Sequence, residues 1–139
     1  MPIPIELQHA SEDFERYLVA ARDASGLATR NQTYTMTEGV FRVFRQRLTV
    51  KDALRFADVL PPVLRAMFVF DWDTEQPKLT FADRGAMTRE AQALRKDHNF
   101  APDSCIGDVA RALRKNVDEK AFDAVLAFLP EGAADFWKV

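Results

Sequence analysis

An internal duplication constrains the fold of this chain more than any other feature. Residues 39–68 align with residues 108–137 at a constant offset of 69 positions and without a gap. Matched positions keep apolar residues, and the identical pairs are Val40/Val109, Arg42/Arg111, Arg45/Arg114, Lys51/Lys120, Leu60/Leu129 and Pro61/Pro130. Self-similarity at a fixed spacing is typical of repeated supersecondary units. It predicts two similar halves related by an approximate two-fold axis, and it says nothing about chemistry.

The apolar residues recur with a helical period in both halves, so we predict an all-α fold. Ser11 is the expected cap of the first helix, Thr35 and Glu38 have the spacing of a capping box, and Thr49 and Asp118 can each cap a helix. Residues 1–10 are expected to be an extended arm. The predicted helices are 12–25, 36–47, 50–60, 62–68, 85–98, 103–116, 119–129 and 131–137.

We expect a single domain over residues 1–139, since this length is that of one ordinary domain. Its first repeat would span about 12–68, a connector about 69–84, and its second repeat about 85–137. Each repeat reads as four helices. The predicted core is Phe14, Leu18, Phe41, Phe44, Leu48, Phe56, Leu60, Leu64, Val109, Leu113, Phe122, Val125 and Leu129.

Composition excludes several classes of protein. Hydrophobic residues make up 47% and charged residues 29%, which is typical of a soluble globular chain, and the net charge is −2. A chain this close to neutral indicates neither nucleic-acid binding nor attraction to an anionic membrane. No apolar run is long enough to span a membrane, and no signal peptide is visible. The single Cys105 rules out an intramolecular disulfide, so a cytoplasmic location is the default expectation.

Several motifs resemble those of a bacterial family known as domain of unknown function 2267. The matching stretches are FERYLVAARDASGL, then LTVKDALRFADVLPPVLRAMF, and the Trp72-Asp73 pair that follows. Two positions depart from the family pattern, since Asp71 stands where glycine is expected and Thr74 where proline is expected. The resemblance runs from about residue 13 to the C-terminus. It implies an all-α fold of repeated helices, and it brings no catalytic residues with it.

Two polar clusters are candidates for chemistry, and neither is complete. Asp71, Asp73 and Glu75 alternate as in the first half of a calcium loop, but the required glycine and final glutamate are missing. The second cluster consists of Asp97, His98, Asp103 and Cys105. It lacks the convergent ligands of a zinc site and the oriented base of a cysteine nucleophile. We therefore expect no metal and no cofactor.

The duplicated arginines are the candidate binding residues. Arg42 and Arg45 share the outer face of the predicted helix 36–47, and Arg111 and Arg114 share the outer face of its counterpart. Related by a two-fold axis, they could form a basic strip that binds an anion or an acidic partner. The alternative is that they only solvate the surface of an amphipathic helix and form local ion pairs.

The favoured hypothesis for function is a non-enzymatic protein-interaction or structural module, with self-association as a homodimer its simplest form. Phe70 and Trp72, in the connector, are the expected interface residues, because large apolar residues outnumber catalytic candidates. The alternative is a small-molecule or anion-binding protein, or an enzyme, that uses a cleft between the two halves. Cys105, His98 or the paired arginines would line that cleft.

Overall fold

The computed structural model describes residues 3–139, and within this range it contains helices and no strands. The all-α prediction is therefore confirmed, in one compact domain. The α-helices are α1 (Ile5–Gln8), α2 (Ala10–Ser25), α3 (Arg30–Arg45), α4 (Val50–Ala57), α5 (Pro62–Val69), α6 (Arg84–Ala93), α7 (Cys105–Lys115), α8 (Glu119–Phe128) and α9 (Ala133–Phe136). A short 3-10 helix, η1, spans Lys96–His98.

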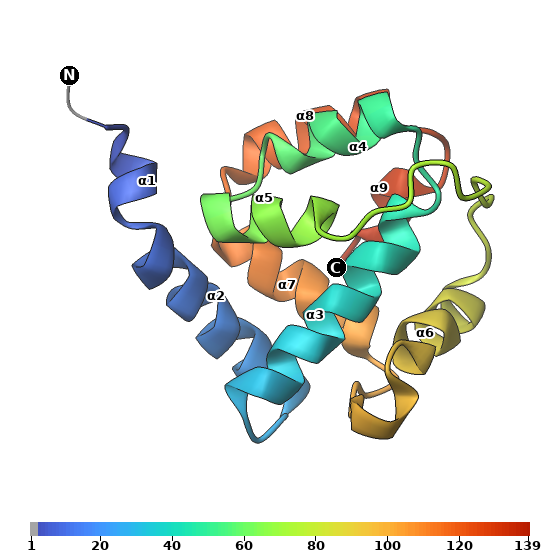
Figure 1. Cartoon of the computed structure of the whole chain (residues 1–139), viewed down its shortest axis with the longest axis horizontal. Helices are drawn as coiled ribbons and strands as arrows, with labels where there is room; N and C mark the ends of the chain where they lie inside the picture. The colour runs from blue at the N-terminus through green and yellow to red at the C-terminus, as the bar shows by residue number, and fades with distance from the viewer. Residues whose placement is uncertain (1–2) are drawn as a thin grey trace.

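Helix α3 is the central element of the arrangement (Figure 1). It packs against α2, α5, α6 and α7, while α4 pairs with both α5 and α8. The α1–α2 segment runs along one side of the molecule, and α1 extends away from the other helices (Figure 1). None of the helices in residues 3–139 is long and apolar enough to cross a membrane.

Helix α3 begins six residues earlier than the sequence predicted. The capping box is formed by Thr29 and Gln32, whose side chains each bond to the other residue's backbone amide. Thr35, the predicted cap, lies inside the helix and donates its hydroxyl to the carbonyl of Asn31 at 3.1 Å. A hydroxyl that bonds one turn back is compatible with a helix interior. The local sequence would permit an N-cap at Thr29 or at Thr35, and α3 begins after Thr29.

The beginning of the chain also differs from its prediction. Residues 5–8 form the short helix α1 rather than an extended arm, with Pro4 at its N-cap, where a missing donor costs nothing. Helix α2 then starts at Ala10, one residue before the predicted cap Ser11, and its N-cap residue His9 makes no capping bond. Gly26 ends α2 in the left-handed conformation with φ 75°, which glycine adopts without strain.

The predicted helix 85–98 is interrupted. Helix α6 ends at Ala93 and Arg95 adopts the left-handed conformation with φ 49°. The amide of Asn99 donates to the carbonyls of Ala91 and Leu94 at 2.9 and 2.8 Å, which satisfies the end of the helix from outside. The remaining predicted helices agree with the structure to within a few residues. Thr49 and Asp118 cap α4 and α8 as expected.

The core is dominated by phenylalanine rings around Phe44. Every predicted core residue is buried except Phe14 and Val125, which are partly buried at its edge. Phe136 and Trp137, near the end of the chain, are buried in this cluster. The indole N–H of Trp137 finds no acceptor in the part of the chain that the structure describes. A buried unpaired donor costs about 1–3 kcal/mol, which the surrounding apolar packing must offset.

The connector packs on the end of α3. The amide of Leu79 donates to the carbonyl of Gln46 at 3.0 Å, and Arg47 donates to the carbonyl of Thr80 at 3.1 Å. The buried guanidinium of Arg47 also holds both carboxylate oxygens of Glu90 on α6, at 3.2 and 2.6 Å. Arg47 thus holds α3, α6 and the connector together, and a cleft lies between these three elements.

Candidate functional site

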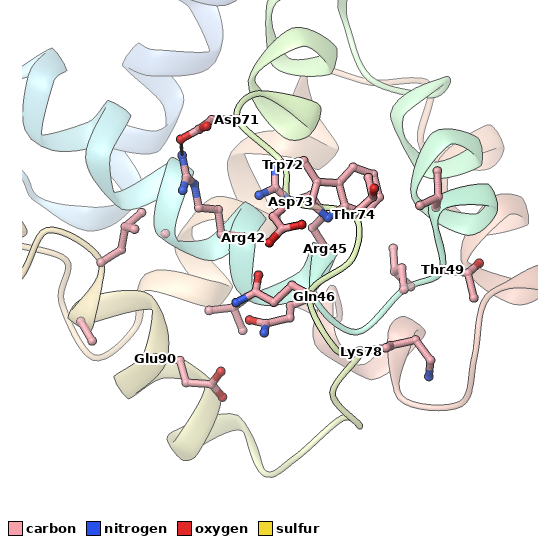
Figure 2. A pocket seen from close by; sticks show the side chains of 17 residues that line it. Arg42, Arg45, Gln46, Thr49, Asp71, Trp72, Asp73, Thr74, Lys78 and Glu90 are labelled. Carbon is pink, nitrogen blue, oxygen red and sulfur yellow. Dashed lines mark ion pairs between the residues drawn. The ribbon is translucent and has the colours of Figure 1, made fainter.

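A cleft of about 750 Å³ lies between α3, α6 and the connector (Figure 2). Its lining includes Arg42, Arg45, Gln46, Asp71, Trp72 and Glu90. Two of the four predicted arginines, Arg42 and Arg45, and one of the two predicted interface residues, Trp72, therefore meet in one place. The volume is within the usual range for small-molecule sites.

The side chain of Arg45 is engaged in contacts that stabilise the fold. It was expected on the outer face of its helix, but its side chain is buried and donates from Nη1 to the carbonyls of Phe68 and Phe70, each at 3.0 Å. These carbonyls lie at the end of α5, where the helix leaves its last carbonyls unpaired. The guanidinium also lies 5.1 Å from the ring centre of Trp72, in a cation–π contact.

The second arginine of the cleft is shared between two acids. Arg42 Nη2 lies 3.6 Å from Glu38 and 3.9 Å from Asp71, whose contact with Arg42 is drawn in Figure 2. Burial lowers the pKa of Arg45 to about 10, the positive charge of Arg42 acts in the same direction, and Asp71 and Glu38 oppose both. The charges of the cleft are therefore largely balanced within the chain, and no free basic strip exists there.

The backbone conformation of Asp71 shows why the family pattern has glycine at this position. Its φ is 51°, in the left-handed region where a side chain is strained and glycine is at ease. Aspartate tolerates this conformation better than most residues. The expected glycine thus corresponds to a real backbone requirement, and its replacement places a carboxylate at the mouth of the cleft.

Arg111 and Arg114, the second pair of predicted arginines, lie elsewhere. Arg114 donates from Nε to the carbonyl of Trp137 at 3.0 Å and from Nη1 to Glu119 and Asp123 at 3.2 and 2.9 Å. Arg45 donates to the carbonyl of Phe68, and Arg114 donates to the carbonyl of Trp137. The two carbonyls are 69 positions apart in the sequence, as the two arginines are. Arg111 is exposed and pairs with Asp108 at 3.2 Å.

The His98 and Cys105 cluster does not assemble. His98 is exposed at the end of η1, whereas Cys105 is fully buried in the first turn of α7. Neither residue lines the cleft. In the acidic cluster, the carboxylate of Asp73 accepts from the amide of Glu75, as in an ordinary polar turn. Across residues 3–139 no group of three His, Cys, Asp or Glu side chains is placed to hold a metal ion.

Cys105 is expected to be unreactive in the folded protein. Burial raises the pKa of its thiol to about 11 from 9.0, and the nearby charge of Asp108 adds to this. Because the raised pKa favours the neutral thiol in the folded state, the stability from this group is complete below about pH 9 and is lost as the pH rises towards 11. Thiol labelling at pH 8 should be slow until the protein is denatured. In the variant Cys105→Ala, the loss of stability at high pH that comes from this thiol should be absent. Rapid labelling of the native protein would contradict the prediction that the thiol is unreactive.

One exposed surface was missed by the sequence reasoning. The exposed stripe of α4 contains Lys51, Leu54 and Arg55, and that of α8 contains Lys120, Ala124 and Phe128. We call these six residues the α4–α8 face. The signal was present in the sequence, since Leu54 and Phe128 fall on the polar side of their helical wheels. Of the two predicted interface residues, Phe70 is exposed, whereas the ring of Trp72 contacts the guanidinium of Arg45.

Comparison with known proteins identifies the class of this chain. A family model described as "Uncharacterized conserved protein (DUF2267)" matches residues 14–136, so the chain belongs to that family. This confirms the resemblance found in the sequence motifs. No curated protein matches the chain.

Proposed function

We propose that this protein is a non-enzymatic interaction module that pairs with a second copy of itself through the α4–α8 face. The observation that carries the proposal is the exposure of Phe128, a large apolar residue that is 74% accessible at the end of α8. A reducing compartment such as the cytoplasm suits its single buried thiol.

The α4–α8 face is apolar at its centre and basic around it. Phe128 and Leu54 are its exposed large apolar residues, and a shallow depression beside Phe128 is lined by Arg55, Ala124, Val125 and Phe128. The guanidinium of Arg55 lies 5.8 Å from the ring centre of Phe128. Lys51 and Lys120 are exposed on the same two helices. Two such faces would repel each other, so the face favours an apolar partner that carries acids.

The first residues of the described chain have this chemistry. Ile3, Ile5 and Leu7 are exposed, with Ile5 at 72%, and the acids Glu6 and Glu12 are exposed beside them. Glu6 lies 3.7 Å from Arg65 of its own chain, and exposed pairs of this kind contribute little. We propose that residues 3–12 of one copy cover the α4–α8 face of the other, reciprocally, which closes a two-fold dimer.

The proposal includes two halves related by an approximate two-fold axis, over about 12–68 and 85–137. Two observations support it. The capping residues Thr49 and Asp118 and the carbonyl-binding arginines Arg45 and Arg114 each keep the offset of 69.

Sedimentation velocity tests the dimer. We expect a concentration-dependent dimer at tens of micromolar that Phe128→Asp converts to monomer. A matched control is Phe100→Asp, since Phe100 is 60% exposed in the loop before α7 and the change is chemically identical. The control should dimerise like the parent protein. A strictly monomeric parent, or equal loss of dimer in both variants, would refute the proposal.

The partner segment needs its own variant. Ile5→Asp should weaken the dimer as Phe128→Asp does, because it places a charge in the apolar contact. Raising the salt concentration should also weaken the dimer, since the acids of one copy face the basic rim of the other. A dimer that survives Ile5→Asp but not Phe128→Asp would show that another surface of the second copy covers the face.

A small-molecule role for the cleft is the second candidate. The observation in its favour is the half-buried ring of Trp72 in a cleft of suitable volume. Native mass spectrometry of protein purified from its own host tests it. A bound mass that is present in the parent protein and lost in Trp72→Ala would support a ligand, and its absence from both would argue against one.

A further inference from the structure

Two arginines from different helices converge on one point above α7. Arg84 of α6 and Arg111 of α7 place their Nη2 atoms 3.4 and 3.5 Å from the position that a Cβ would occupy on Gly107. The two nitrogens are therefore at most about 7 Å apart. Like charges this close destabilise each other, and Asp108, which accepts from Nη2 of Arg111 at 3.2 Å, offsets the charge of Arg111. Because Gly107 has no side chain, nothing from this residue fills the space between them.

The surroundings form a groove of about 700 Å³ between α6 and α7, with a third arginine, Arg89, on its wall. Among residues 3–139, Arg84 makes two long contacts, from Nη1 to the carbonyls of Asp135 and Lys138 at 3.5 and 3.3 Å. Its Nη2 bonds to none of these described residues and can bind a ligand.

Two acids at or beside the groove are already engaged. Asp108 does not line the groove, but it accepts from the hydroxyl of Ser104 at 2.6 Å and from Nη2 of Arg111 at 3.2 Å. Asp103 accepts from the amide of Gln92 at 3.0 Å. Against these two carboxylates the groove carries three guanidinium groups, so its balance is positive.

We propose that this groove binds the phosphate group of a small phosphorylated molecule, which bridges Arg84 and Arg111 above Gly107. Guanidinium groups present paired N–H donors whose spacing matches phosphate oxygens, and charge-assisted bonds of this kind are strong. A doubly charged phosphate offsets the arginines better than a singly charged carboxylate. The rest of the groove, on the side of Thr88 and Gln92, would accommodate the remainder of the molecule. This site is separate from the α4–α8 face.

Titration with inorganic phosphate, followed by NMR at constant ionic strength, tests the site. In the parent protein we expect saturable shifts of the Arg84 and Arg111 Nε–H signals and of the backbone amides of residues 104–108. The variant Arg111→Gln should bind at least about tenfold more weakly. Its matched control is Arg16→Gln, an exposed arginine on α2 that already pairs with Asp13 at 3.0 Å. The control should bind like the parent.

Gly107→Ala separates binding from folding. Its added Cβ meets the two guanidinium nitrogens at ordinary contact distances, and alanine is the better helix former. The melting temperature should therefore be unchanged or higher while phosphate binding is lost. Unsaturable shifts, or equal shifts in Arg16→Gln and Arg111→Gln, would overturn the site. Full binding in Gly107→Ala would overturn its position, and acetate binding as tight as phosphate would overturn the assignment to phosphate.

Discussion

Replacing Phe44 with alanine is expected to lower the free energy of unfolding by about 3–5 kcal/mol, because it opens a cavity in the most crowded part of the core. The ring of Phe44 is fully buried and lies within 6.4 Å, centre to centre, of the rings of Phe56, Phe68, Phe81, Phe136 and Trp137. These neighbours come from four different segments of the chain and cannot all move to fill the space. Urea denaturation followed by circular dichroism measures the loss.

Phe100→Ala is the control for this measurement, since it removes the same side chain from an exposed loop. Its effect should stay within about 0.5 kcal/mol. A loss below about 1 kcal/mol for Phe44→Ala would mean that the core can collapse around the missing ring, against the reasoning from its neighbours.

Gly39→Ala is expected to destabilise the protein by about 2 kcal/mol, although alanine normally improves a helix by up to about 1 kcal/mol over glycine. A Cβ on Gly39 would lie 2.5 Å from the carbonyl oxygen of Ala91, so α3 and α6 would have to separate. That carbonyl belongs to a backbone already fixed by Asn99 and cannot rotate away as a side chain would.

Gly107→Ala is the comparison for Gly39→Ala, because both glycines lie within helices and only one faces another backbone. Differential scanning calorimetry should show a lower melting temperature for Gly39→Ala and an unchanged or higher one for Gly107→Ala. If the two variants moved in the same direction, the close approach of α3 and α6 would not be the cause.

The sequence predicted most of the helices and the core because both depend on a local period. Apolar residues at three and four residue spacing identify the inward face of α4, α7 and α8 wherever that face is apolar. The first half of α3 lacks this pattern, since its inward positions include Thr33 and Thr37. Thr37 is buried because its hydroxyl meets that of Tyr17 on α2 at 2.7 Å. A partner twenty residues away cannot be read from the helix itself, so the true start of α3 was missed.

The candidate site was less predictable, and Arg45 shows why. On a helical wheel it belongs to the polar side, and sequence reasoning places it in solvent. The structure buries it because the end of α5 presents unpaired carbonyls at that place. The groove at Gly107 was equally hidden, since Arg84 and Arg111 are 27 positions apart and meet only when α6 and α7 are packed.

The two tryptophans of the chain occupy opposite environments. Trp137 is wholly enclosed by phenylalanine rings, while Trp72 lies half-buried at the cleft against a positive charge. Indole emission shifts to shorter wavelength in apolar surroundings, so Trp137 should emit at shorter wavelength than Trp72. The protein therefore carries two built-in optical reporters. One follows the integrity of the interior, and the other follows events at the surface, without any label being attached.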